Sequence, residues 1–282
     1  MANTWIVGLD GSSGAFSALR WAAGVAELND DRVAPVAAWH VPLPIAAMAG
    51  RRPIDFDRAG LQAEVEYQAL RSIEQLDDAE RVDDLRVVEG HPAPALLQLS
   101  GPGSPLVVGR RGISALKHRL LGSVSQYLVT HANGPVVVVP DDSDVKGLQR
   151  IVVGFDGSEE ASAALRWAIS IAPEGSDVEA LVAIDVIPWL SPERVAELHP
   201  DEVEAARTRI STAADAADPD GRATRNFVLH GPRQALAEAL SDADLVVVGP
   251  RGIGSVAHAV LGSVTTWLLH EAPCPIAVVP SA

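Results

Sequence analysis

The sequence has few of the features that place a protein outside the cell, in a membrane or on a nucleic acid. Its one cysteine, Cys274, cannot form a disulfide within the chain, so a reducing compartment such as the cytoplasm is expected. No apolar run approaches the roughly 18 residues of a membrane-spanning helix, so no membrane is expected as a partner. Lysine and arginine total 22 against 37 aspartates and glutamates, which gives a formal net charge of −15. Because such a surface repels a phosphate backbone, no nucleic acid is expected as a partner either.

Common nucleotide motifs and metal-ligand clusters are also missing from the sequence. The chain has no Gly-x-x-x-x-Gly-Lys-Ser/Thr loop, and residues 8–14 lack the glycine spacing of a dinucleotide fingerprint. Neither a P-loop motor nor a dehydrogenase is therefore indicated. Cysteine and histidine do not occur at metal-ligand spacing, and no serine, histidine and aspartate can be placed together. We therefore predict no resident metal and no catalytic residue.

A glycine-rich pattern is present, and it occurs twice. Residues 109–112 (Gly-Arg-Arg-Gly) are followed after nine residues by Gly122-Ser123, and residues 249–252 (Gly-Pro-Arg-Gly) are followed after nine residues by Gly262-Ser263. Glycines can bring backbone N–H groups close to an anion, and a Gly-Ser pair that opens a helix presents more of them. The pattern predicts two phosphate sites. The alternative is that the glycines only let the chain turn.

The duplication extends beyond the glycine loops. Residues 7–12 (Val-Gly-Leu-Asp-Gly-Ser) reappear at 153–158 as Val-Gly-Phe-Asp-Gly-Ser, and residues 18–22 (Ala-Leu-Arg-Trp-Ala) reappear unchanged at 164–168. Each copy has the size of an ordinary domain, and two copies are too few for a stacked-repeat protein. We predict two similar domains, 1–141 and 149–282, joined by a polar linker.

Each copy alternates short aliphatic runs with helical patterns. The expected strands cover residues 5–9, 33–39, 85–89, 105–108 and 135–139 in the first copy, and 151–155, 178–184, 223–229, 245–248 and 275–279 in the second. Aliphatic strands separated by helices indicate a parallel sheet that is covered on both faces. The predicted class is α/β, with two tandem doubly wound five-stranded parallel-sheet domains. Ser12 is expected to cap the first helix, and Trp21 and Trp167 to pack a domain interface.

An aspartate follows the first strand of each copy. Ligands of an open parallel sheet bind beyond the carboxyl ends of its strands, so Asp10 and Gly109 would face one crevice if the first and fourth strands are neighbours. Asp156 and Gly249 repeat this arrangement. The carboxylate would bind sugar hydroxyls and the loop would bind phosphates. The alternative is that both aspartates are only turn residues or helix caps, because Asp-Gly-Ser is a good turn sequence by itself.

Together, the Val-Gly-x-Asp-Gly-Ser start, the Gly-x2-Gly-x9-Gly-Ser loop and the closing Pro-Val-Val-Val-Val-Pro resemble the universal stress protein family in its tandem, ATP-binding form. The resemblance covers both copies apart from residues 42–60 and the linker. It implies a fold like that of the adenine nucleotide alpha hydrolases, with strand order 3-2-1-4-5, and one ATP in each domain. Any Mg²⁺ would enter on the phosphates of ATP.

The resemblance also implies roles for particular residues. The two aspartates would contact ribose, the loops and helix starts would hold phosphates, and adenine would lie against the end of the second strand. The residues expected at the nucleotide are Gly8, Asp10, Trp39, Gly109, Arg111, Gly112, Gly122, Ser123, Val124 and Ser125 in the first copy, and Gly154, Asp156, Ile184, Gly249, Arg251, Gly252, Gly262, Ser263, Val264 and Thr265 in the second. At Ser123–Ser125 and at 263–265, either the hydroxyls or the N–H groups would reach phosphate.

The second loop departs from the first in ways that predict weaker binding. Pro250 replaces Arg110 and removes one backbone donor. The cations near the first loop are Arg110, Arg111, Lys117, His118 and Arg119, whereas the second loop offers Arg251 and His258. We therefore expect the second site to hold nucleotide more weakly than the first.

Taken with the resemblance, the sequence favours a nucleotide-dependent regulator of stress response or growth arrest, acting through the conformation or assembly that it adopts with ATP bound. One alternative is a slow ATPase or phosphate-transferring enzyme, although a general base near the loops is not evident. Another is a nucleotide-free scaffold in which the glycine loops are vestigial and the last strands pair between domains. The sequence identifies no protein partner and leaves open whether two chains form a homodimer.

Overall fold

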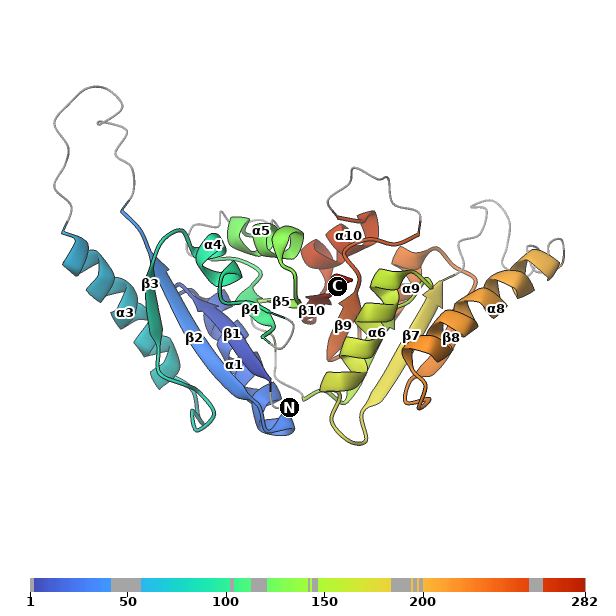
Figure 1. Cartoon of the computed structure of the whole chain (residues 1–282), viewed down its shortest axis with the longest axis horizontal. Coiled ribbons are helices and arrows are strands. Elements are labelled where there is room, and N and C mark those ends of the chain that lie inside the picture. Colours follow the sequence, from blue (N-terminus) through green and yellow to red (C-terminus); the bar gives the residue numbers. More distant parts are fainter. Residues whose placement is uncertain are drawn as a thin grey trace, which may run out of the picture.

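Figure 1 shows the computed structural model, in which two similar α/β halves lie side by side. The structure describes residues 3–41, 57–101, 104–112, 121–141, 143, 147–183, 194, 197, 200–253 and 261–281. The first half contains β1 (Thr4–Leu9), α1 (Ser13–Asn29), β2 (Arg32–Trp39), α3 (Arg58–Glu74), β3 (Arg86–Glu89), α4 (Pro92–Leu97), β4 (Leu106–Gly109), α5 (Ser123–His131) and β5 (Val136–Val139). The second half contains β6 (Arg150–Gly154), α6 (Glu159–Ile171), β7 (Asp177–Ala183), α8 (Pro200–Ala217), β8 (Thr224–Val228), α9 (Pro232–Ala239), β9 (Leu245–Val248), α10 (Ser263–Glu271) and β10 (Ile276–Val278).

The ten strands form one sheet in the order β3-β2-β1-β4-β5-β10-β9-β6-β7-β8. Within each half the strands are parallel and follow the predicted order 3-2-1-4-5. The halves join where β5 and β10 pair antiparallel, with Ala277 opposite Val137. This pairing of the last strands was expected only under the scaffold alternative, yet it coexists with an intact cavity in each half.

Local sequence explains where the elements begin and which side they bury. Every predicted strand agrees with the structure to within one residue at either end. The Ser12 hydroxyl accepts a hydrogen bond from the Ala15 N–H at 3.1 Å, which confirms the predicted cap of α1. β4, β5 and β9 are buried along their whole length, as expected of strands covered on both faces. In the described part of the chain, no helix is both long and apolar enough to cross a membrane.

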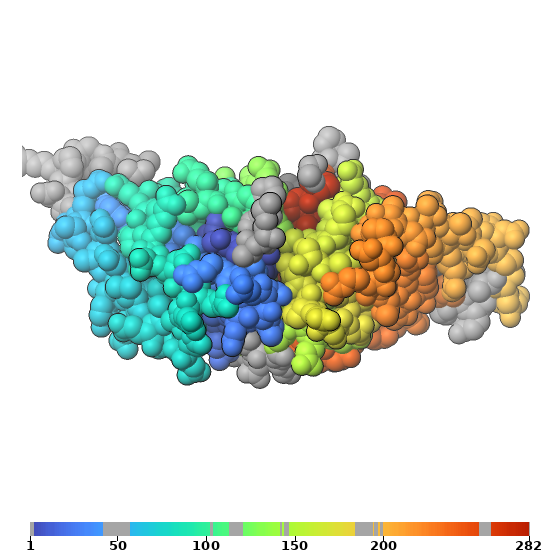
Figure 2. All heavy atoms as spheres, turned by 60° about the horizontal axis from the view of Figure 1, so that its bottom comes forward, coloured from blue at the N-terminus to red at the C-terminus, as the bar shows by residue number. Residues whose placement is uncertain are grey.

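Helices cover both faces of the sheet. One apolar layer is formed with α1, α3, α6 and α8, and the other with α4, α5, α9 and α10. The Trp5 ring lies 5.6 Å from the ring of Trp21 in its own half and 6.3 Å from that of Trp167 in the second half, both edge to face. Figure 2 shows the two halves in direct contact, and the Asn29 side chain donates to the Ile171 carbonyl at 2.9 Å. Trp167 therefore packs across the domain interface against Trp5, as predicted, whereas the ring that Trp21 contacts belongs to its own half.

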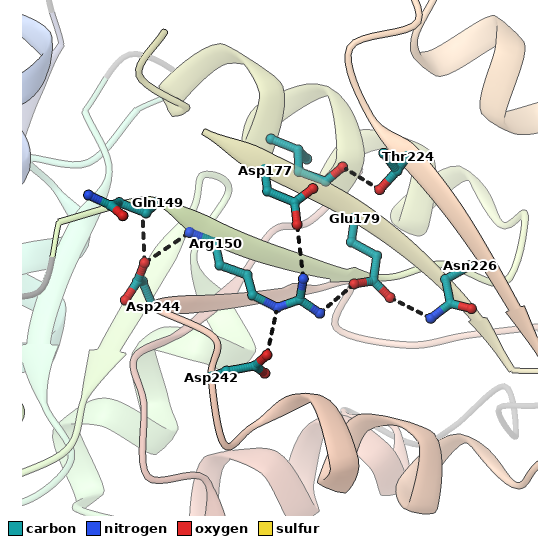
Figure 3. A network of polar contacts seen from close by, with 9 residues as sticks. Gln149, Arg150, Asp177, Glu179, Thr224, Asn226, Asp242 and Asp244 are labelled. Carbon is teal, nitrogen blue, oxygen red and sulfur yellow. Dashed lines mark hydrogen bonds and ion pairs between the residues drawn. The ribbon is translucent and has the colours of Figure 1, made fainter. Parts of the chain in front are cut away.

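A polar network closes the second half at the amino ends of its strands, opposite the crevice (Figure 3). Arg150 pairs with Glu179 at 2.6 Å and with Asp177 at 2.9 Å. Glu179 also accepts a hydrogen bond from Asn226 at 2.8 Å, and Asp244 accepts the Arg150 N–H at 2.9 Å. Because these contacts tie β6 to β7 and β8, they fix the strand spacing without occupying the carboxyl ends.

Candidate functional site

Each half contains a cavity at the carboxyl ends of its first and fourth strands, where the sheet changes its direction of winding. The cavity of the first half has a volume of about 350 Å³, and that of the second about 430 Å³. Nine of the ten residues expected in the first half line its cavity: Gly8, Asp10, Gly109, Arg111, Gly112, Gly122, Ser123, Val124 and Ser125. Nine of the ten expected in the second half line the other: Gly154, Asp156, Gly249, Arg251, Gly252, Gly262, Ser263, Val264 and Thr265.

The remaining two expected residues are Trp39 and Ile184. Trp39 does not line the first cavity; Ala38 does, because successive residues of a strand point to opposite faces. The Trp39 ring is buried, with the Arg58 guanidinium 5.5 Å from its centroid. Ile184 lies outside the described residues, as do Lys117, His118, Arg119 and His258. The alternation of side chains along β2 could have predicted that only one of Ala38 and Trp39 faces the cavity.

Asp10 and Asp156 combine a turn role with a place in the cavity. Ser12 donates its N–H to Asp10 Oδ1 at 3.0 Å, and Ser158 donates its N–H to Asp156 Oδ1 at 2.9 Å. Asp156 Oδ2 also accepts the Ile253 N–H at 2.8 Å. The turn interpretation is therefore correct for both aspartates, and it leaves each carboxylate at the wall of its cavity.

The glycines allow backbone and carboxylate to approach closely. A Cβ at Gly109 would lie 2.5 Å from the Gly14 carbonyl carbon and 2.9 Å from the Ala15 nitrogen. A Cβ at Gly112 would come closer than 3.0 Å to Asp10 Oδ2, and a Cβ at Gly252 would do the same at Asp156. Position 109 requires glycine because a side chain would meet the backbone of the first helix, whereas a side chain at 112 or 252 would displace the aspartate carboxylate from its place.

A helix begins at the edge of each cavity. α5 begins at Ser123 and α10 at Ser263, each after an N-cap glycine in extended conformation. The first N–H groups of a helix have no carbonyl partner within it, and the N-terminus carries a partial positive charge. The Ser125 hydroxyl donates to the Gly109 carbonyl at 2.7 Å, and the Thr265 hydroxyl donates to Gly249 at 2.9 Å. Those two hydroxyls therefore fix the loops, and the N–H groups are the donors that the helix starts offer.

The loop arginines are held differently in the two halves. Arg111 pairs with Asp141 at 2.5 Å, whereas Arg251 lies 3.8 Å from Glu160.

Arg110 points its guanidinium away from the cavity, and its N–H donates to the Val139 carbonyl at 2.7 Å. Because that N–H is already used within the fold, the replacement by Pro250 does not remove a phosphate donor. That part of the argument for a weaker second site was wrong.

Sequence reasoning missed the apolar wall of each cavity. Beyond Ala38, the first wall includes Val36, Pro92 and Leu96, and its equivalents in the second half are Leu181, Ala183, Pro232 and Leu236. A signal was available in the repeat, since Pro92-x3-Leu96 recurs as Pro232-x3-Leu236. In the sequence, however, these residues cannot be distinguished from ordinary core positions.

Known proteins resemble this chain over nearly its whole length. The universal stress protein family model matches residues 1–140 and 147–280. A universal stress protein of Mycolicibacterium smegmatis is 30% identical over 295 residues, covering 97% of this chain and 96% of the relative. One of Mycobacterium tuberculosis is 33% identical over 300 residues, covering 97% and 95%. A solved universal stress protein from Archaeoglobus fulgidus superposes with a TM-score of 0.65 at 19% identity and covers 100% of both chains, which shows the shared fold.

Proposed function

Since the chain belongs to the universal stress protein family, with one domain of that family in each half, we propose that it binds ATP in both cavities and acts as a nucleotide-dependent regulator. The proposed domains are residues 1–141 and 149–282, and the proposed setting is the cytoplasm. In this proposal the protein works through the conformation or assembly that it adopts with nucleotide bound, on a protein partner that is not identified.

The observation that carries the proposal is the meeting of a carboxylate, a glycine loop and a helix start in one cavity. Asp10 lies against Gly112, and the cavity beside them includes Ser123 at the start of α5. The carboxylate suits ribose hydroxyls, which are hydrogen-bond donors, and the helix N–H groups suit phosphate oxygens. Asp156, Gly252 and Ser263 repeat the same chemistry in the second half.

The rest of each cavity fits a nucleoside. Volumes of about 350 and 430 Å³ fall within the range of roughly 300–1,000 Å³ that small-molecule sites occupy. The apolar wall made by Val36, Ala38 and Leu96 suits the flat face of a base. When bound, Mg²⁺ would neutralise part of the phosphate charge, and among the described residues Arg111 and Arg251 are the cations that line the cavities.

A regulator is favoured over an enzyme because the carboxylates near the phosphate end already have partners. Asp141 pairs with Arg111, and Glu160 lies beside Arg251. Fast hydrolysis needs a positioned base and an electrophilic clamp. The scaffold alternative is favoured by the antiparallel pairing of β5 with β10, which already joins two domains in the way that it requires.

Mass spectrometry of the purified protein after denaturation tests the three alternatives first. We expect co-purified ATP from a binding regulator, ADP from an ATPase and no nucleotide from a scaffold. Titration calorimetry with Mg-ATP then tests the sites. We expect two sites in the natural protein and loss of one in Asp10→Ala and in Asp156→Ala, because each missing carboxylate weakens its site about ten- to hundredfold.

The matched control is Asp215→Ala, which removes an exposed carboxylate paired with Arg225 on the surface. This variant should retain both sites. Two full-affinity sites in Asp10→Ala and Asp156→Ala would refute the assignment of the carboxylates. An absence of ATP binding in the natural protein would refute the proposed function as a whole.

A further inference from the structure

Arg110 belongs to the first glycine loop, but its side chain reaches the second half. Its neighbours Gly109 and Arg111 both line the first cavity. Its guanidinium donates instead to the carbonyl of Ala272 and, at 3.4 Å, to that of His270. The backbone of Arg110 thus belongs to the loop beside the first cavity, while its side chain contacts the second half.

The carbonyls that Arg110 contacts are at the C-terminal end of α10. Ala272 is the C-cap of this helix, and His270 is in its last turn. The last carbonyls of a helix have no partner within it, and a cation at that end interacts favourably with the helix dipole. α10 is only nine residues long, and its first residue, Ser263, lines the second cavity. Fixing one end of such a short helix therefore fixes the other.

The backbone of Arg110 holds the equivalent helix of its own half. Its carbonyl accepts the N–H of Gly122, the N-cap of α5, at 2.8 Å. Its N–H donates to the Val139 carbonyl at the end of β5. One residue is therefore bonded to the start of α5 and to the end of α10, the two helices whose N-termini form the proposed phosphate sites.

The guanidinium is also enclosed by the junction between the halves. Burial lowers the pKa of Arg110, and its Nε is buried with no hydrogen-bond partner among the described residues. A buried cation keeps its position only where its other donors are well satisfied. The two α10 carbonyls accept hydrogen bonds from those donors, so the guanidinium is held in place at the end of α10, unlike the cation of an exposed surface pair.

Among the described residues, the second half has no counterpart to this contact. Pro250 occupies the equivalent position, and its carbonyl accepts the Gly262 N–H at 2.8 Å, as Arg110 does for Gly122. Proline has no side-chain donor, so it cannot reach the end of α5. The side-chain link therefore runs in one direction, from the first glycine loop to the helix of the second site.

From this geometry we infer that Arg110, a residue of the first loop, is a positioning residue for the second nucleotide site. The inference rests on the proposed function, since it assigns a role toward nucleotide at that site. Arg110 does not touch the second cavity. It acts by holding the C-terminal end of α10, so that the N–H groups at the other end stay aimed at the phosphates.

The test compares the two sites one at a time, with Mg-ATP as the probe and calorimetry as the measurement. In Asp10→Ala only the second site is expected to bind, and in Asp156→Ala only the first, so each variant lets one site be measured alone. Adding Arg110→Met should weaken the second site about three- to tenfold, the size of effect that a cation at a helix C-terminus produces. The first site should change less than twofold, because the Arg110 backbone remains. Arg110→Lys should restore most of the affinity of the second site.

Arg20→Met is the matched control, because Arg20 also donates from its guanidinium to a backbone carbonyl, that of Ser143, at 2.5 Å, without contacting α10. It should leave the second site unchanged. Equal weakening of both sites by Arg110→Met, no weakening of the second, or the same effect from Arg20→Met would overturn the inference. If Arg110→Met does not fold, Arg110→Gln takes its place with the same expected direction.

Amide hydrogen exchange, measured without nucleotide, tests whether Arg110 holds α10 independently of whether the protein binds ATP. Arg110→Met should speed exchange in α10 at least threefold and leave α5 unchanged. If the natural protein binds no ATP, the proposed function fails and the role toward nucleotide fails with it, while exchange still decides whether Arg110 holds α10. If ATP binds but neither affinity nor exchange responds to Arg110→Met, only the inference fails.

Discussion

The two halves keep the same backbone around the cavity and differ in the charges placed on it. The Ser125 and Thr265 hydroxyls donate to the equivalent carbonyls of Gly109 and Gly249, at 2.7 and 2.9 Å. By contrast, Gly14 of the first half is replaced by Glu160 in the second, 146 positions later. The difference teaches that the close approach of backbone elements is the shared requirement, whereas the neutralisation of the loop arginine can be achieved in two ways.

The first arginine is paired with a residue beyond the last strand of its half, and the second lies near the first helix of its half. Arg111 pairs with Asp141, two residues after the end of β5, while Arg251 is near Glu160 in α6. A carboxylate at residue 14 is excluded because a Cβ there would lie 2.5 Å from the Arg111 carbonyl oxygen. The first half must therefore place its counter-charge elsewhere, and Asp141 supplies it from beyond the end of β5.

The largest expected effect comes from adding one methyl group to each glycine loop. A Cβ at Gly109 meets the Gly14 carbonyl carbon and oxygen at 2.5 and 2.6 Å, whereas a Cβ at Gly249 first meets Glu160 Cβ at 2.7 Å. Gly109→Ala should lower the free energy of unfolding by about 3 kcal/mol and Gly249→Ala by about half as much, because the added Cβ meets three atoms closer than 3.0 Å at Gly109 but only one at Gly249. Urea unfolding measures both.

Gly101→Ala is the control, since a Cβ at Gly101 meets nothing within 4 Å. It should be neutral or slightly stabilising. An equal or larger loss for Gly249→Ala than for Gly109→Ala would show that the two loops are not packed as differently as the contacts indicate.

Much of the fold could be predicted from the sequence because its strands are continuous aliphatic runs. The runs 135–139 and 245–248 contain only residues that suit a buried parallel strand, apart from the opening proline, and their ends were correct to within one residue. The antiparallel pairing of Ala277 with Val137 was not part of the predicted sheet. Pairing between strands so far apart depends on how two finished domains dock, which local patterns do not encode.

The site was predictable where the repeat marks it and unpredictable where packing decides. Asp10 and Gly109 stand out because they recur in the second half with the same spacing to their neighbours. The direction of the Arg110 side chain depends on the end of α10, which lies 160 residues away in the sequence. Leu96 looks like any core leucine, so its place in the cavity wall follows only from the arrangement of α4 over β1 and β2.

A second prediction compares the amino ends of the strands in the two halves. In the first half, Asp31 accepts the Trp5 indole N–H at 2.9 Å and the Asn3 N–H at 2.6 Å, and no arginine among the described residues pairs with it. In the second half, Arg150 holds the buried Glu179 (Figure 3). Arg150→Met should cost about 2 kcal/mol of unfolding free energy. The range for broken buried pairs is higher, about 3–5 kcal/mol, but Arg150 is partly exposed.

The control for this pair is Arg225→Met, which removes the partner of the exposed Asp215 and should cost less than about 1 kcal/mol. Amide exchange should quicken in β7 and β8 for Arg150→Met and remain unchanged in β1 and β2. If Arg150→Met lowers the unfolding free energy no more than Arg225→Met does, the network in Figure 3 contributes little to stability, and the contrast between the halves disappears.

A third prediction concerns Cys274, whose equivalent in the first half is Gly134. Burial raises the pKa of the Cys274 thiol from 9.0 to about 12. Above pH 9 the unfolded thiol loses its proton while the folded one keeps it, so the unfolded state binds fewer protons and stability falls as the pH rises toward 12. Between pH 9 and pH 10 the natural protein should lose about 1 kcal/mol more than Cys274→Ala. Equal slopes of unfolding free energy against pH would contradict this.

The smallest expected effect tests whether Glu160 competes with nucleotide for Arg251. The two side chains lie 3.8 Å apart and are 23% and 42% exposed, so their pairing contributes little to stability. Glu160→Gln keeps the shape and removes the charge. It should change the unfolding free energy by no more than about 0.5 kcal/mol, including the weaker interaction with the N-terminus of α6.

In a protein that also carries Asp10→Ala, so that only the second site binds, Glu160→Gln should tighten Mg-ATP binding about two- to fivefold, because Arg251 is no longer shared with Glu160. Asp141→Asn, measured with Asp156→Ala, is the equivalent change at Arg111 and should have the larger effect, since that pair is closer and less exposed. Weaker binding in Glu160→Gln would mean that this carboxylate supports the second site instead of competing for its arginine.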